Sequence, residues 1–157
     1  MNKRIVLKSV LAVVMVGFIL SVSSCQKDEK KIIGVWKYEK IELKEFSCSN
    51  PFVEAMVKMS FQMNAGVLVK EMGLETVEFT KDGKVISKNE TVKYKIDGDK
   101  LTITGSENIS GTFDISFPDK KQMYWNMNML ELYGEYAAEL IKDGVTKFVV
   151  QITFAKQ

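Results

Sequence analysis

The chain has 157 residues and a mass of 17.8 kDa, the size of one ordinary domain. Its 46% hydrophobic and 27% charged residues are typical of a globular protein. Histidine is absent, which excludes Ser-His, Cys-His and His-metal chemistry. Lys3, Arg4 and Lys8 lie in the first 24 residues, which hold no acid. Beyond them, 19 basic residues (22 less 3) face 20 acidic ones, so the charge predicts no nucleic-acid partner.

Residues 1–24 have the three parts of a secretory signal peptide: a basic start, an apolar run over 10–20 and small residues over 21–24. The apolar run is shorter than the roughly 20 residues that a membrane span needs. Val22-Ser23-Ser24-Cys25 resembles the bacterial lipobox. That resemblance implies cleavage before Cys25 and attachment of fatty acyl chains, such as palmitate, to this residue. The alternative is a cleaved signal peptide that releases an unanchored protein.

Residues 25–31 follow as a lipid-anchored polar tether. Gln26 at the second position is similar to lipoproteins sorted to the outer membrane. The order Gln26-Lys27-Asp28-Glu29 also resembles the export signal of surface-displayed lipoproteins in some Gram-negative bacteria. An ordinary charged linker is the alternative. We expect the protein to be anchored in the outer membrane through its acyl chains, with cell-surface display slightly favoured.

The remaining domain, residues 32–157, begins with a predicted strand over 34–43 that has Trp36 and Tyr38 on one face. Asn50-Pro51 then predicts a helix start, with Asn50 as the cap and Pro51 in the first turn. Apolar residues recur at helical spacing from Phe52 to Leu68, and polar ones form only a narrow edge. We therefore expect this helix to be well covered by the rest of the protein.

The second half predicts a meander of short strands, each with one apolar face. Asp-Gly pairs at 82–83, 97–98 and 143–144 predict tight turns, and residues 132–141 predict a short helix before the last strand. Eight strands joined mainly by hairpins bury their apolar faces best in a closed antiparallel barrel. The fold class is therefore all-β, with one helical insertion after the first strand. The later strands are expected at 76–80, 85–87, 92–96, 101–103, 109–117, 123–129 and 145–154.

Three stretches, in this order, carry a family resemblance: Ile33-Gly34-Val35-Trp36, residues 77–84 and residues 94–103. The first is similar to the lipocalin Gly-x-Trp, and the other two resemble hairpins of lipocalin-like domains in small Gram-negative lipoproteins. The resemblance implies an eight-stranded, calycin-type barrel and binding of a small hydrophobic ligand. In typical lipocalins an arginine of the last strand packs on the opening tryptophan, but here the only arginine is Arg4. Lys147 and Lys156 are the candidates for that position.

Residues suited to catalysis are few. Asp82, Asp97 and Asp99 lie in predicted turns, where aspartate serves the backbone. Metal-ligand spacing and phosphate-binding glycine loops are absent from the sequence, so we expect no catalytic residue, metal or cofactor. Cys48 has no histidine to activate it and is expected to be a small buried or loop residue.

The many methionine and aromatic residues support binding of a hydrophobic ligand, because methionine adapts its shape at irregular binding surfaces. The alternative is a tightly packed core. A second hypothesis is a protein-interaction module that uses Tyr124, Asn126 and Asn128, on the strand face opposite Trp125. The candidate ligand-binding residues, under a helix acting as a lid, are Met56, Met59, Met63, Tyr94, Phe113, Trp125 and Met127.

Overall fold

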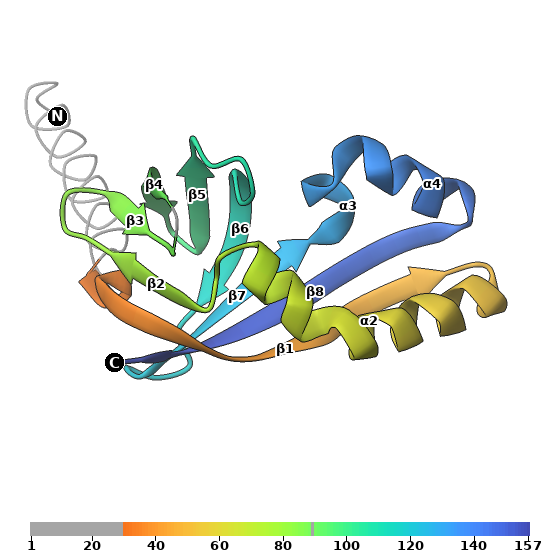
Figure 1. Cartoon of the computed structure of the whole chain (residues 1–157), viewed down its shortest axis with the longest axis horizontal. Coiled ribbons are helices and arrows are strands. Elements are labelled where there is room, and N and C mark those ends of the chain that lie inside the picture. The colour runs from red at the N-terminus through yellow and green to blue at the C-terminus, as the bar shows by residue number, and fades with distance from the viewer. Residues whose placement is uncertain (1–29, 89) are drawn as a thin grey trace, which may run out of the picture.

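The computed structural model describes residues 30–88 and 90–157 (Figure 1). The predicted signal peptide, Cys25 and most of the predicted tether lie outside the described residues. Lys30–Ile32 are helical and lead into the first strand. Ile32 is fully buried, so the described chain joins the hydrophobic core almost as soon as it begins.

Eight antiparallel strands form a closed barrel in which each strand pairs with the next and the last pairs with the first. The predicted fold class is confirmed, including the helix after the first strand and the helical segment before the last. One face of each short strand is buried, and these faces supply most of the core. The strands are β1 (Gly34–Cys48), β2 (Thr76–Phe79), β3 (Lys84–Ile86), β4 (Thr91–Asp97), β5 (Lys100–Thr104), β6 (Gly111–Ser116), β7 (Gln122–Asn128) and β8 (Val145–Lys156).

Strands β1 and β8 are 15 and 12 residues long and pair with each other from Trp36↔Lys156 to Cys48↔Val145. Their neighbours end much earlier, since β2 pairs only with Gly34–Lys37 of β1. The distal halves of β1 and β8 therefore extend past the barrel as a two-stranded ribbon (Figure 1). Three register shifts interrupt the pairing. Two of the shifts place an extra residue in β1, after Tyr38 and after Leu43, and the third places one in β8, so the paired ribbon continues past residue 43, where the sequence predicted the first strand to end.

Helix α2 (Pro51–Glu71) runs back from the tip of this ribbon towards the barrel (Figure 1). The predicted cap is confirmed, because the Asn50 side chain accepts hydrogen bonds from the backbone N–H groups of Phe52 and Val53. The prediction that α2 is well covered is wrong, since only Val69 is fully buried. The cause is that α2 lies along the narrow ribbon, which covers one side of a helix only.

Helices α3 (Met129–Leu132) and α4 (Ala137–Lys142) flank a 3-10 turn at Gly134–Tyr136 and pack against β8. The seventh strand ends before Met129 because the Asn128 side chain accepts a hydrogen bond from Leu130 N–H and caps α3. Within the described residues, no helix combines the length and the apolar character needed to cross a membrane. Together, α3 and α4 form a second arm that lies along β8 of the ribbon (Figure 1).

The closed end of the barrel is built around Trp36, which is fully buried. Its indole N–H donates a 2.6 Å hydrogen bond to the Ile32 carbonyl. The Lys156 ammonium lies 5.1 Å from the Trp36 ring centroid and also donates to the Lys31 carbonyl at 3.0 Å. Lys147 instead forms an ion pair with Glu45 on the ribbon. Lys156 therefore occupies the position expected of the missing arginine, with an ammonium over the ring in place of a guanidinium.

Replacing Lys156 with methionine keeps an apolar stem but removes the charge over Trp36 and the hydrogen bond to Lys31. We expect the free energy of unfolding, measured by urea denaturation, to fall by about 1 kcal/mol. Lys156→Arg should retain most of the stability. Lys147→Met is the matched control, because its ion pair with Glu45 is exposed to solvent and contributes little to stability. Equal losses from Lys156→Met and Lys147→Met would contradict this role for Lys156.

Candidate functional site

Three of the predicted ligand-binding residues, Phe113, Trp125 and Met127, meet inside the barrel, where each is at most 4% exposed. The Trp125 ring lies between those of Phe113 and Phe154, with centroid distances of 5.2 and 5.8 Å. Met123 and Met127 flank Trp125 on the inward face of β7 and are fully buried. The barrel interior next to Trp125 is therefore aromatic on two sides and lined by flexible thioethers along the strand.

The indole N–H of Trp125 is buried and has no hydrogen-bond partner among the described residues. A buried donor without an acceptor costs about 1–3 kcal/mol, and native proteins rarely leave one unpaired. The other tryptophan, Trp36, is equally buried but has its acceptor in Ile32. Trp125 is thus a hydrogen-bond donor directed into an apolar interior, an arrangement suited to one oxygen atom of a bound molecule.

Tyr94, a fourth candidate, lies apart from this group. Its hydroxyl donates to the Thr80 carbonyl at 3.0 Å, and its ring packs edge-on against Phe79. It lines a surface pocket of about 380 Å³ together with Lys30 and Ile33, at the end that the N-terminal residues close. Tyr94 therefore has a structural hydrogen bond and packs against the core, whereas the α2 methionines are not part of that core.

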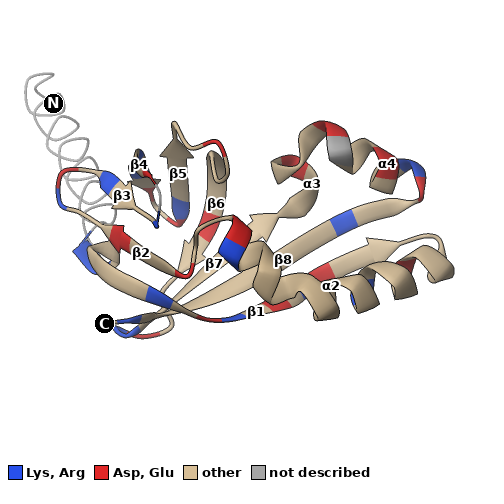
Figure 2. Ribbon diagram, viewed as in Figure 1, with Lys and Arg blue, Asp and Glu red and all other residues tan. Residues whose placement is uncertain are grey.

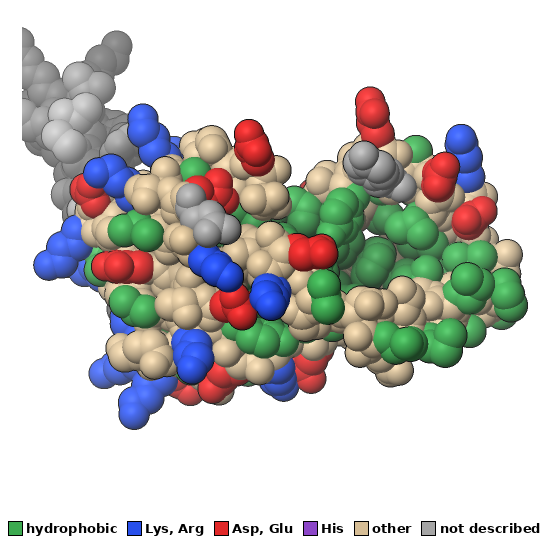
Figure 3. All heavy atoms as spheres, viewed as in Figure 1, with side chains coloured by type: hydrophobic (Ala, Val, Ile, Leu, Met, Phe, Trp, Pro, Cys, Tyr) green, Lys and Arg blue, Asp and Glu red, His purple; other side chains and the backbone are tan. Residues whose placement is uncertain are grey.

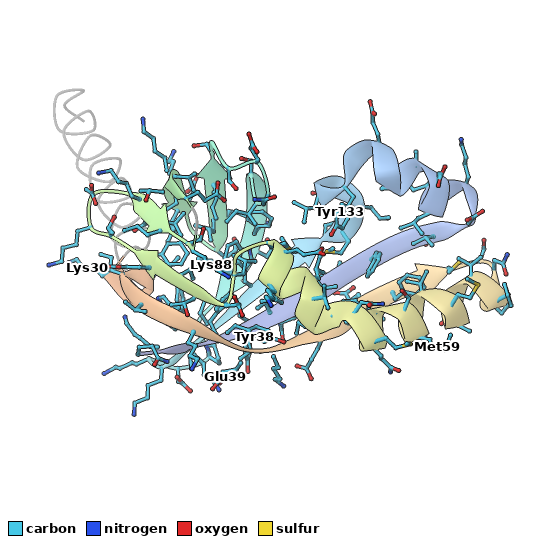
Figure 4. All side chains as sticks on the ribbon, viewed as in Figure 1. Lys30, Tyr38, Glu39, Met59, Lys88 and Tyr133 are labelled. Carbon is cyan, nitrogen blue, oxygen red and sulfur yellow. The ribbon has the colours of Figure 1, made fainter. Side chains whose placement is uncertain are left out.

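The α2 methionines Met56, Met59 and Met63 are 52–75% exposed and lie together on the outer side of the helix. Figure 4 labels Met59 at that outer surface. The structure therefore does not bring these three residues to the barrel interior. Only the last turn of α2, with Val69 and Met72, joins the core at the barrel end.

A pocket of about 340 Å³ opens at the mouth of the barrel, where the end of α2, the β5–β6 connection and α3 meet. Its lining includes Tyr133, which Figure 4 labels beside α3. Burial raises the pKa of Tyr133, and the nearby Glu71 carboxylate adds to the effect. The lining residues are Leu68, Glu71, Met72, Glu107, Asn108, Leu132 and Tyr133.

Beyond this mouth the surface is hollowed between α2 and the α3–α4 arm, and hydrophobic side chains line the hollow (Figure 3). We call this hollow the apolar cleft. Phe148 of β8 packs edge-on against Phe46 of β1 and Phe61 of α2, with ring centroids 5.4 and 6.3 Å apart. On α4, Ile141 is four residues after the buried Ala137 and so shares its inward face, yet it is 55% exposed. An inward-facing isoleucine that remains exposed indicates an open apolar surface.

The α3–α4 arm and Phe46 were not among the site residues predicted from the sequence. Phe148 is in the predicted last strand, but its partner Phe46 lies beyond the predicted end of the first strand. The apolar alternation of β8 continues for more residues than in the neighbouring strands, and this was the one sequence feature that indicated a ribbon. Pairing partners of that ribbon are set by the bulges, which the sequence does not reveal.

Two residues considered for chemistry have structural roles. Asp82 pairs with Lys84 in the β2–β3 turn, and hydrogen bonds from Lys84 and then Thr80 lower the pKa of Asp82 to about 2. Cys48 is half-buried at the ribbon tip, with its sulfur 3.7 Å from the Asp143 carbonyl. Both lie on turns or ends of strands, away from the barrel interior.

These features define the protein as a closed eight-stranded barrel whose interior holds an unpaired donor and whose mouth continues into an apolar cleft. A family model described as a lipocalin-like domain matches residues 32–125, from the buried Ile32 to Trp125 of β7. The chain belongs to this lipocalin-like family, whose fold is typically non-enzymatic. No curated protein gives a significant match. No solved structure gives one either.

The two buried tryptophans allow a direct test of the unpaired donor. Trp36→Phe removes a hydrogen bond and leaves the Ile32 carbonyl without it, whereas Trp125→Phe removes packing alone. We expect Trp36→Phe to lower the free energy of unfolding by about 1–2 kcal/mol more than Trp125→Phe, measured by urea denaturation. Equal losses, or a larger loss for Trp125→Phe, would show that the Trp125 indole has a partner in the folded protein.

Proposed function

We propose that this protein is a lipid-anchored cell-envelope lipoprotein that binds a small hydrophobic ligand at the open end of its barrel. The observation that carries the proposal is the unpaired indole N–H of Trp125 within an apolar interior. A ligand with an apolar body and one hydrogen-bond-accepting oxygen fits this arrangement, as in a fatty acid or a related acyl compound. The acceptor would satisfy Trp125, and the apolar body would extend through the mouth into the apolar cleft.

Access to Trp125 requires side chains that can change conformation at low cost. Met123 and Met127 flank it on β7, and Met72 lies at the mouth. Methionine has three rotatable bonds and no branch, so it adapts to a ligand more readily than leucine or isoleucine does. The aromatic rings of Phe113 and Phe154 remain as fixed walls. This arrangement supports an interior that admits a ligand by repacking methionines.

The envelope location rests on the N-terminal sequence. Cys25 directly follows a signal-like segment and closes a lipobox-like sequence, and the described domain begins only five residues later. Several acyl chains hold a protein at a membrane far more firmly than one, since each buried CH₂ contributes about 0.8 kcal/mol. The proposed location is the outer membrane, with the domain displayed at the cell surface.

A protein-interaction module is the second candidate function. The β7 face that carries Asn126 and Asn128 supports this function only weakly. Asn126 accepts hydrogen bonds from Lys44 and Gln151, and Asn128 caps α3. These two side chains are engaged within the fold. The observation that favours an interaction surface is instead the exposed apolar side of α2.

Native mass spectrometry tests ligand binding. All eight strands, the described helices and the core lie within residues 30–157, so a protein that begins at Lys30 keeps the folding unit. Purified gently from cells, it should carry an added mass that disappears on denaturation. A bare protein mass after expression in several hosts, together with no binding of a fluorescent fatty acid, would overturn the ligand-binding proposal.

The fluorescent fatty acid also tests the role of Trp125. Trp125→Phe should weaken its binding about tenfold, the equivalent of one hydrogen bond of about 1.4 kcal/mol. Pyrene, an apolar probe without an oxygen acceptor, should bind both proteins alike. Trp36→Phe is the control for a tryptophan lost elsewhere. Unchanged fatty-acid affinity in Trp125→Phe would argue against the indole as the polar contact.

Replacement of the proposed acylation site tests the anchor. Cys25→Ser should prevent acylation and move the full-length protein from the membrane to the aqueous fraction, as judged by cell fractionation and metabolic labelling with palmitate. Cys48→Ser is the matched control and should stay with the membrane. A Cys25→Ser protein that remains fully membrane-bound would overturn the lipoprotein assignment.

A further inference from the structure

The outer side of α2 carries an apolar stripe that the fold leaves uncovered. Phe52, Met56, Met59, Met63 and Val67 are 52–75% exposed. At about 100° per residue, Phe52, Met59 and Met63 lie within about 20° of the point opposite Phe61, the residue that packs on β8. The helix is thus apolar on two opposite sides, one of which is packed within the protein.

The spacing of the stripe is that of a helix pairing seam. Its first four residues follow at intervals of four, three and four, the pattern of apolar positions in coiled coils. Ala55, Ser60 and Gln62 border the seam, and none of them is charged. Glu54 and Lys58 pair with each other on another side of α2, whereas Lys70 continues the line of the stripe in the last turn, beyond Val67, next to Glu71 (Figure 2).

The area of the stripe is large for a surface left to water. Side chains of this size, at these exposures, present roughly 600 Å² of mainly apolar surface, at the upper limit for the largest patch on a typical monomer. Two such stripes in contact would bury about 1,200 Å², the lower limit of a stable interface. One further copy of α2 is therefore enough to cover the stripe.

We propose that the protein forms a dimer in which the α2 stripes of two copies pack against each other in antiparallel orientation. The uncharged border favours a second copy, because two identical helices with charged borders would repel each other at the seam. A lipid surface is a poorer occupant, since helices that lie in membrane interfaces carry basic residues along their border. The barrel adjoins one end of α2, so antiparallel packing places the two barrels at opposite ends of the helix pair (Figure 1).

The two-fold axis of such a pair passes near the middle of the stripe, which places Met59 beside Met59 of the second copy. The test uses the full-length protein in cell membranes, with Cys48→Ser as the parent. Met59→Cys in this parent should form a disulfide-linked dimer under mild oxidation. Lys58→Cys, one residue away but on another side of α2, is the matched control and should give no more dimer than the parent. Absence of the Met59→Cys dimer, or equal dimer in both variants, overturns the proposal.

A second measurement does not depend on introduced cysteines. Two differently tagged full-length copies, expressed together, should co-purify after detergent extraction, and Met63→Glu in both should reduce this at least tenfold. Ile86→Glu, at an exposed isoleucine of β3, should leave it unchanged. Fatty-acid binding by Met63→Glu should equal that of the wild type, which separates this proposal from the ligand site. If Met59→Cys is protected from a water-soluble maleimide by membranes without crosslinking, the stripe contacts lipid and the dimer is excluded.

Discussion

The pairing of β1 with β8 is the constraint on which the rest of the structure depends. It closes the barrel at one end, where Lys156 lies over the Trp36 ring and donates a hydrogen bond to the Lys31 carbonyl, just before β1. The same pairing continues past the barrel and provides the ribbon on which α2 and the α3–α4 arm are mounted. Closure of the barrel and construction of the apolar cleft are therefore consequences of one long strand pair.

The closed end and the interior of the barrel have different physical characters. At the closed end every polar group of Trp36 has a partner, and a cation covers the ring. In the barrel interior the second tryptophan, Trp125, has a donor without an acceptor, and Met123 and Met127 flank it on β7. A ligand-binding barrel requires both characters. Its closed end needs rigid contacts with every hydrogen bond made, and its interior needs side chains that can adapt and a polar group free to bind the ligand.

The strand order and the cap of α2 were predictable because they depend on local signals. Alternating apolar residues and Asp-Gly turns specify hairpins, and Asn50 before Pro51 specifies a helix start. The course of α2 was not predictable, because apolar residues on all sides of a helix do not say which side is packed. Nor was the cleft, since the bulges that set the β1–β8 register leave no clear mark in the sequence.

The same bulges affect how the ribbon meets other chains. Beyond Tyr38 the outer edge of β1 has no strand partner in the described part of the chain, and a flat unpaired edge is a template for aggregation. Here the edge is interrupted twice, after Tyr38 and after Leu43, and carries Lys40, Glu42 and Lys44 with alternating charge. A foreign strand would find its hydrogen bonds out of register every few residues. The irregularities of β1 therefore disfavour edge-to-edge polymers of this protein.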